Sequence, residues 1–315
     1  MKKSEIKTVL CLLAVVILLA AVLAVMSTDK ESKEAVKYLL DVNENEITKL
    51  SFANGTDYVH LEKNNGTWKM SDDDTFKVDQ DAASTLIKAL TTTKVAGTIE
   101  VKGQSQLNDY SLLSPQCMIE YSCSSGKTGI IRIGTMSSLT EQLYVLNDEN
   151  AETVYITSNE IAQAFSCEKL DLLRYPDIPK PEKGLQNEVS VTNVYGDIRL
   201  YKENGEWYLD KGDDSIKIDE ETAYNYYFLT WDMHWRGRVE HDSKNLDKYD
   251  LGKPRITYEL KYTEGSEEKT FTLELGSSLP DGTCYAKIKD NNDIFLLDSL
   301  MADWLESTKE EDMTA

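Results

Sequence analysis

The sequence predicts an α+β protein in which an N-terminal transmembrane helix is followed by two tandem repeats, each a mainly antiparallel β-sheet with two helices. Three observations support this prediction. Residues 9–26 form an uninterrupted apolar run, and two distant segments of the chain share one phrase. Within each half, short alternating strand patterns surround a helical apolar stripe.

The repeated phrase consists of a leucine, a Tyr-x-Leu triplet and a proline. Residues 107–115 contain it first, and residues 246–254 contain it again 139 positions later. The same offset aligns Asn-Gly-x-Trp at residues 65–68 with Asn-Gly-x-Trp at residues 204–207. Two landmarks in one register indicate a duplication. We expect eight residues to form its structural signature: Trp68, Tyr110, Leu112, Pro115, Trp207, Tyr249, Leu251 and Pro254.

The duplication divides the chain into six expected segments. They are a cytoplasmic tip with the transmembrane anchor, a stalk, a first α+β repeat, a Pro-rich linker, a second α+β repeat and an acidic tail. Their expected bounds are residues 1–28, 29–46, 47–175, 176–186, 187–306 and 307–315. Pro176, Pro179 and Pro181 should stiffen the linker, and we expect the acidic tail to be disordered.

The apolar run at residues 9–26 is long enough to span a hydrocarbon core of ~30 Å. Lys2, Lys3 and Lys7 precede it and favour a cytoplasmic N-terminus. The expected localisation is therefore the cell membrane, with a single pass through the lipid bilayer and the bulk of the chain extracytoplasmic. A cleaved signal peptide is the competing interpretation, although its apolar region usually runs only ~7–15 residues.

Each repeat should begin with a hairpin and continue into a helix. Asn65-Gly66 supplies the dipeptide of a tight two-residue turn, and Trp68 opens the return strand. Asp79 and Asp219 precede apolar residues at helical spacing and are expected to cap the helices. Alternating patterns after each tyrosine phrase predict further strands, and a short helix should close each repeat at residues 158–165 and 299–305.

The sequence contains few motifs that are typical of catalytic or metal-binding sites. It contains no Gly-rich phosphate loop, no H-E-x-x-H, no G-x-S-x-G and no paired C-x-x-C. His234 and His241 are seven positions apart, which is no recognised metal-ligand spacing. The Asp72-Asp73-Asp74 run does not fit a calcium loop and is better explained as a polar turn. We therefore expect no catalytic residue, no metal and no cofactor.

The charge balance also limits the partners. Asp and Glu number 55 against 34 Lys and Arg, which gives a net charge of −21. Such a surface repels nucleic acid, so we expect no nucleic-acid partner. Cys117, Cys123, Cys167 and Cys284 are sparse for an extracytoplasmic chain and are expected to be unpaired.

One aromatic segment occurs only in the second repeat. Residues 226–238 contain aromatic and arginine side chains that their counterpart near residues 89–99 lacks. Features needed for folding should recur in both copies, whereas a feature of one copy is free to serve a partner. Tyr226, Trp235, Arg236 and Arg238 combine residue types that dominate interface energetics, and we predict that they form a partner surface.

The chain resembles the bacterial domain of unknown function 4340 family in three features. These are the tyrosine phrase, the following hairpin that ends in glycine, and the final strand with its short helix. The resemblance covers most of residues 47–305, although family members commonly carry Tyr-Gly-Leu where Ser111 and Asp250 stand here. It implies a membrane-anchored protein without an assigned reaction. It also implies association with ABC transporters similar to the gliding-motility type, beside a permease and an auxiliary subunit.

We therefore expect a non-catalytic extracytoplasmic accessory or binding subunit of a membrane complex, with a membrane protein as its partner. Two alternatives remain open. One is a cell-envelope hydrolase that acts on glycans through carboxyls held roughly 5–10 Å apart. The other is a small-ligand sensor that uses the gap between the two repeats.

Overall fold

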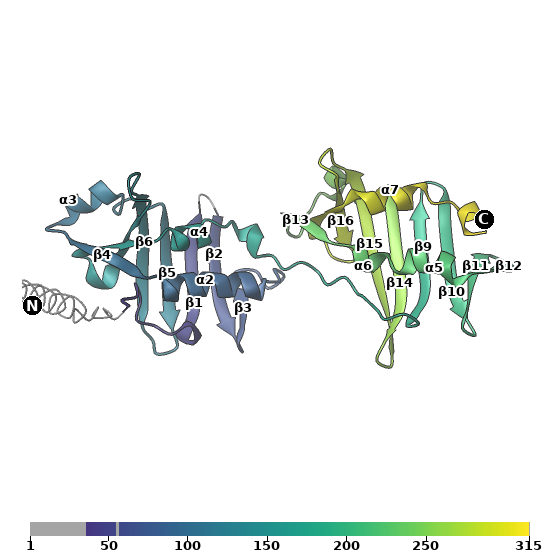
Figure 1. Ribbon diagram of the computed structural model, residues 1–315, viewed down its shortest axis with the longest axis horizontal. Coiled ribbons are helices and arrows are strands. Elements are labelled where there is room, and N and C mark those ends of the chain that lie inside the picture. Colours follow the sequence, from purple (N-terminus) through teal and green to yellow (C-terminus); the bar gives the residue numbers. More distant parts are fainter. Residues whose placement is uncertain (1–35, 55–56, 315) are drawn as a thin grey trace, which may run out of the picture.

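Two antiparallel β-sheets, one from each half of the chain, form the body of the protein (Figure 1). The structure is a computed structural model that describes residues 36–54 and 57–314. The two sheets follow one another along the long axis, and a linker after η4 (Lys169–Leu172) joins them. We call the two halves the first and the second domain.

Among the described residues, the first sheet has eight strands and the second has nine. From edge to edge, the first contains β3 (Thr67–Met70), β2 (Asp57–Asn64), β1 (Ile47–Asn54), β5 (Cys117–Cys123), β6 (Thr128–Met136), β7 (Leu143–Asn147), β8 (Thr153–Thr157) and β4 (Val95–Glu100). The second contains β12 (Asp214–Ile218), β11 (Glu206–Lys211), β10 (Gly196–Glu203), β9 (Gln186–Asn193), β14 (Ile256–Glu264), β15 (Glu267–Ser278), β16 (Thr283–Ile288), β17 (Ile294–Asp298) and β13 (Trp235–Glu240). Apart from β12, the two orders are the same.

The predicted fold class is wrong as stated. Strands dominate both domains, and the helices are short: α2 (Gln80–Thr92) has 13 residues and α5 (Glu220–Tyr227) has 8. No helix in the described part of the chain is long and apolar enough to cross a membrane. The predicted anchor, residues 9–26, lies outside the described residues. The period-2 patterns fill most of each half, which is why the sheets prevail.

Each sheet has helices on one face (Figure 1). In the first domain α2 packs its apolar stripe on the sheet, with Leu86, Ile87 and Leu90 at most 4% exposed. In the second domain α5, α6 (Leu229–Asp232) and α7 (Ser299–Ser307) take this position. The remaining short helices are η1 (Glu44–Glu46), α3 (Gln104–Leu107), η2 (Asn108–Tyr110), η3 (Asp148–Asn150), α4 (Glu160–Ala164), η5 (Leu246–Tyr249) and η6 (Glu310–Met313).

The tryptophan hairpins form as their sequence indicates. Asn65 and Gly66 both have positive φ angles, 49° and 84°, as a two-residue hairpin turn requires. Trp68 and Trp207 are 6% and 2% exposed, so the return strand places each indole in its core. The caps also form, since an Asp79 carboxylate oxygen accepts from the N–H groups of residues 81 and 82.

The tyrosine phrase closes a turn on the opposite face of each sheet. Ser111 and Asp250 adopt left-handed conformations with φ of 58° and 56°. The turn then lies against a glycine of the following hairpin, because a Cβ on Gly134 or Gly276 would stand only 2.2 or 1.9 Å from the preceding tyrosine carbonyl oxygen. Leu112 and Leu251 are buried beneath the turn. Pro115 and Pro254 are half-buried. Tyr110 is half-buried, whereas Tyr249 is buried.

Both ends of the described chain differ from expectation. Leu39 and Leu40, within the expected stalk, are buried in the first core. In the expected tail, Met313 is 2% exposed in the second core, and Lys211 pairs with Glu310 at 2.8 Å. The expected disorder of the tail is therefore wrong for its described residues, because Met313 supplies an apolar anchor.

Candidate binding site at the domain junction

The structure buries Tyr226, the first of the four candidate partner residues. Its side chain is 7% exposed and packs on Trp304 with ring centroids 4.5 Å apart. Its carbonyl oxygen accepts a hydrogen bond from the Tyr258 hydroxyl at 2.9 Å. The expected exposure of Tyr226 is wrong, because α7 covers the face of α5 on which this side chain lies.

Trp235 is half-buried against the start of the linker. Its indole Nε1 donates to the carbonyl oxygen of Pro176 at 2.8 Å. Its ring is nearly parallel to Tyr175, with centroids 6.5 Å apart, and also packs on Phe295 at 5.1 Å. Phe295 is 1% exposed and completes the core of the first domain from the second.

Arg238, in the same strand β13, contacts the first domain directly. Its guanidinium lies 4.0 Å from the centroid of the Tyr175 ring and donates to the carbonyl oxygen of Leu173. It also forms an ion pair with Asp79 at 3.2 Å. Arg236 is exposed and pairs with Asp298 of its own domain at 3.1 Å. Trp235 and Arg238 thus join the two domains, and contact of this segment with a partner stays a prediction.

The first domain contributes residues 71–79, which we call the junction loop, to the contact between the domains. Asp73 Oδ2 lies 3.3 Å from His241 Nε2, and the Phe76 ring lies edge-on to the same imidazole at 4.9 Å. On its other side, His241 Nδ1 lies 2.5 Å from Asp293 Oδ1. One imidazole therefore links a carboxylate of each domain.

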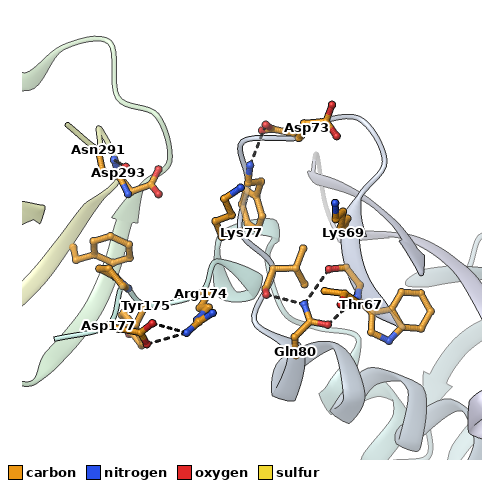
Figure 2. Close-up of a pocket in the computed structure, with 16 residues that line it drawn as sticks. Thr67, Lys69, Asp73, Lys77, Gln80, Arg174, Tyr175, Asp177, Asn291 and Asp293 are labelled. Carbon is orange, nitrogen blue, oxygen red and sulfur yellow. Dashed lines mark hydrogen bonds and ion pairs between the residues drawn. The ribbon is translucent and has the colours of Figure 1, made fainter. Parts of the chain in front are cut away.

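A cleft of about 440 Å³ opens between the junction loop, β3, the linker and the second domain (Figure 2). Polar and charged residues line it together with the apolar surface of Trp68, Phe76 and Phe295. Arg174 and Asp177 form an ion pair at 2.7 Å within it. Its remaining labelled residues are Thr67, Lys69, Asp73, Lys77, Gln80, Tyr175, Asn291 and Asp293.

Gln80, which lines this cleft, forms hydrogen bonds with the edge of β3. Its Oε1 accepts from the backbone N–H of Trp68 at 2.8 Å, and its Nε2 donates to the Trp68 carbonyl oxygen at 2.9 Å (Figure 2). Nε2 also donates to the Val78 carbonyl oxygen at 2.9 Å. A single side chain therefore pairs with both outward backbone groups of one strand residue.

In the second domain a strand takes this place. β12 pairs with β11, and Ile218 lies opposite Trp207. The corresponding junction loop pairs with Leu173 through the Val78–Leu173 bridge. It stays beside β3 without pairing with it, because Gln80 Nε2 donates to the carbonyl oxygens of both Trp68 and Val78. Within the described residues, β2 is therefore the only strand that pairs with β3.

The electrostatics of the cleft favour ionised carboxylates. The hydrogen bond from the Thr75 hydroxyl lowers the pKa of Asp73, and backbone N–H groups and His241 add to that effect against the opposing effect of burial. Asp72, in the expected polar turn, pairs with Lys169 at 3.7 Å. No group of three or more His, Cys, Asp or Glu in the described residues could hold a metal ion.

Sequence reasoning missed Gln80, Asp293 and Tyr175 as residues of this site. One signal was available. Asp79 follows Trp68 by eleven positions, whereas Asp219 follows Trp207 by twelve. This difference of one residue marks the segment that takes two different paths.

Comparison with known proteins identifies a family. Residues 68–230, more than half of the chain, match the family described as Domain of unknown function (DUF4340). The match runs from β3 through the linker into α6, so it includes the junction loop but ends before Trp235, Arg238 and His241 of the second domain. No curated protein and no solved structure matches the chain.

Proposed function

Because the chain belongs to the DUF4340 family, we propose that it is a non-catalytic extracytoplasmic accessory or binding subunit of a membrane complex of the ABC-transporter type. The link to a transporter comes from the resemblance of its tyrosine phrases to that family. The link to binding comes from the junction between the domains.

The cleft at the junction is the observation that supports a binding role most directly. Ligand sites commonly lie at domain interfaces, in clefts of about 300–1,000 Å³. Here Trp235 and Arg238 hold the domains together, and the cleft of about 440 Å³ stays open beside them. It offers charged side chains from the junction loop, the linker and the second domain, which are groups that can orient a polar partner.

The carboxylates of the cleft fit a hydrolase less well. A glycosidase needs a carboxyl that stays protonated to act as general acid, and its pKa must therefore be raised. The pKa of Asp73 is lowered instead, first by the Thr75 hydroxyl. Asp73 and Asp293 are also both engaged by His241, which leaves neither free to attack a sugar.

A small-ligand sensor is the second candidate, since the cleft volume also suits a small molecule. The two candidates differ in what they retain from the membrane. An accessory subunit should hold a membrane protein, whereas a sensor should hold a small molecule that survives purification from cells.

The test is affinity purification of the intact protein from its own membrane, with identification of bound proteins and of bound small molecules. We expect to recover a transporter permease or its auxiliary subunit. Lys77→Glu, in the cleft, should reduce this recovery severalfold, while Lys253→Glu, an exposed lysine outside the cleft, should leave it unchanged. Recovery of a small molecule alone would favour the sensor, and equal recovery with both variants would rule out the cleft as the binding site.

A further inference from the structure

We propose that the contact between the two domains depends on pH through His241. A doubly protonated His241 binds Asp73 of the first domain and Asp293 of the second at the same time, and it releases Asp73 when it loses a proton. The inference goes beyond the proposed function, because it concerns how the domains hold together and applies whatever the cleft binds.

His241 follows β13 and lies between the domains, with its side chain only 14% exposed. Asp293 of the second domain faces Nδ1 and is 9% exposed, whereas Asp73 of the junction loop faces Nε2. Figure 2 shows these two carboxylates on opposite sides of the junction. The Phe76 ring packs edge-on against the imidazole at 4.9 Å. Because little solvent screens this site, the charge of the imidazole acts strongly on both carboxylates.

Each carboxylate is held in place by its own domain. Asp73 Oδ1 accepts from the N–H and the hydroxyl of Thr75 at 3.1 and 2.6 Å, and from the N–H of Phe76 at 3.2 Å. Asp293 Oδ1 accepts from the N–H of Asp242 at 3.0 Å. These hydrogen bonds do not involve the imidazole, so both carboxylates face the junction whatever the charge of His241.

The hydrogen bonds around His241 require a proton on each ring nitrogen. Nδ1 lies 2.5 Å from Asp293 Oδ1. Nε2 lies 3.3 Å from Asp73 Oδ2 and 3.3 Å from the Thr75 hydroxyl oxygen. That hydroxyl donates its one proton to Asp73 Oδ1, so its oxygen can only accept from Nε2. A neutral imidazole has a single N–H, and its other nitrogen would present a lone pair to the lone pairs of oxygen.

The other charged groups around His241 are exposed or engaged elsewhere. Asp74 and Lys77 of the junction loop are exposed, as are Lys289 and Asp290 of the turn before β17. The remaining acidic side chains of the surrounding segments have partners of their own: Asp72 with Lys169, Asp242 with Lys244, and Glu240 with the Tyr249 hydroxyl. Asp73 is therefore the carboxylate through which the first domain responds to the charge of His241.

Contact between the domains accordingly takes up a proton. When the domains separate, His241 keeps Asp293 but loses Asp73, and an imidazole that loses a neighbouring carboxylate binds its proton less tightly. Because the docked state binds more protons than the separated state, docking becomes more favourable as the pH falls through about 8 to 5, the range in which histidines change charge. The Thr75 hydroxyl lowers the pKa of Asp73 below its ordinary 3.8, so Asp73 stays ionised throughout this range.

The experiment follows cleavage of the Arg174–Tyr175 bond by trypsin in the intact protein at pH 6 and at pH 8. This bond lies within the junction, because Tyr175 packs against Trp235 and Arg238. Each rate is divided by the rate for an unstructured peptide with the same bond, which removes the pH dependence of trypsin itself. We expect the corrected rate to be about fivefold lower at pH 6 than at pH 8, as for one partly exposed, charge-assisted hydrogen bond.

Variants identify the groups that cause the response. His241→Gln keeps a polar side chain that cannot change charge, so its corrected rate should be equal at both pH values. His234→Gln is the matched control, because His234 is exposed in the same segment and contacts the carbonyl oxygen of Asp232. It should keep the fivefold response. Asp73→Asn leaves His241 in place and should also abolish the response, whereas Asp74→Asn, at an exposed carboxylate one position away, should keep it.

A second measurement detects the protons directly. The chain has three histidines, so NMR of protein labelled at the histidine ring nitrogens can resolve each of them, with His234→Gln and His241→Gln for assignment. At pH 6 we expect both ring nitrogens of His241 to carry a proton.

Three results would overturn the proposal. The first is an equal corrected rate at pH 6 and pH 8 in the parent protein. The second is a fivefold response that persists in His241→Gln or in Asp73→Asn. The third is a His241 ring with a single proton at pH 6. None of these results bears on recovery of a membrane partner, so the proposed function would stand or fall separately.

Discussion

The junction loop and β12 follow the same tryptophan strand in the two domains but pair with different neighbours. β12 returns along β11 and extends the second sheet. The junction loop leaves β3, bridges to the linker at Leu173 and places Asp73 and Phe76 against His241 of the second domain. The two domains share one scaffold. The segment that forms strand β12 in the second domain forms a loop at the contact between the domains in the first.

This difference indicates what each half contributes. The second domain has a covered edge at β11 and supplies Trp235 and Arg238 to the contact. In the first domain the Gln80 side chain, rather than a strand, pairs with the edge of β3, and this domain receives that contact. Duplication therefore yields two domains with similar cores and different edges. The predictions below test first the similarity of the cores and then the contact between the domains.

The largest effect should come from the two tryptophans that the domains share. Trp68→Ala and Trp207→Ala should each lower the free energy of unfolding of their own domain by about 3–5 kcal/mol, as for other large aromatics removed from a core. Chemical denaturation followed by far-UV circular dichroism measures this, because Trp68 is the only tryptophan between residues 47 and 175. Tyr58→Ala, at a side chain 63% exposed, should change stability by less than about 0.5 kcal/mol. A large difference between the two tryptophan variants would break the equivalence of the cores.

The glycines behind the tyrosine turns should rank next. Gly134→Ala and Gly276→Ala would force a Cβ to within 2.2 and 1.9 Å of a backbone carbonyl oxygen, and such overpacking should cost about 1–3 kcal/mol in each domain. Thermal unfolding is the measurement. Gly97→Ala is the control, since its nearest neighbour would lie at 3.5 Å, an ordinary contact. If Gly134→Ala were as mild as the control, the turn would not pack as described.

Arg238→Ala should weaken the contact between the domains rather than either core. It removes the ion pair with Asp79 and the donor to Leu173, and we expect a loss of about 1–3 kcal/mol in the coupling of the two domains. The measurement is whether two calorimetric transitions separate, together with faster proteolysis in residues 176–186. Thr98→Ala, at the matching position of β4, should do neither. Unchanged coupling in the arginine variant would mean that the junction is held elsewhere.

The smallest effect should be the response of the junction to acid. The pKa of Asp73 is lower in the folded protein than its ordinary 3.8, so its contribution is present above that value and is lost as the pH falls through the folded pKa. Asp73→Asn should therefore lower stability slightly at neutral pH, and the difference from the parent protein should shrink as the pH falls below about 4. Stability measured between pH 2 and pH 7 tests this. If the variant and the parent protein differed by the same amount at every pH, the Asp73 carboxylate would make no pH-dependent contribution to stability.

Local signals in the sequence predicted the local structure well. The Asn65-Gly66 turn, the Asp79 cap and the burial of both tryptophans depend on residues close in the chain, and the structure contains them. The path of the junction loop depends on Leu173, almost a hundred positions later, and no local pattern encodes that pairing. The burial of Tyr226 likewise depends on Trp304.

The candidate site shows the same limit. The aromatic segment was identified from its absence in the first repeat, but its neighbours Tyr175 and Pro176 lie in the linker. The thiols followed expectation more closely: Cys117, Cys123 and Cys284 are free and buried. Burial raises the pKa of Cys284 to about 12, so this thiol should react slowly in the folded protein.

The position of β4 has a consequence for how the chain acquires its structure. β4 precedes β5 in the chain, yet its only partner among the described strands is β8, the last strand of the first sheet. A nascent chain that ends before Thr153 therefore leaves β4 with no ladder to join. Each domain should accordingly fold as one cooperative unit after its final strand emerges. Docking of the two domains through Trp235 and Arg238 requires β13, so it can begin only after the second domain has been synthesised.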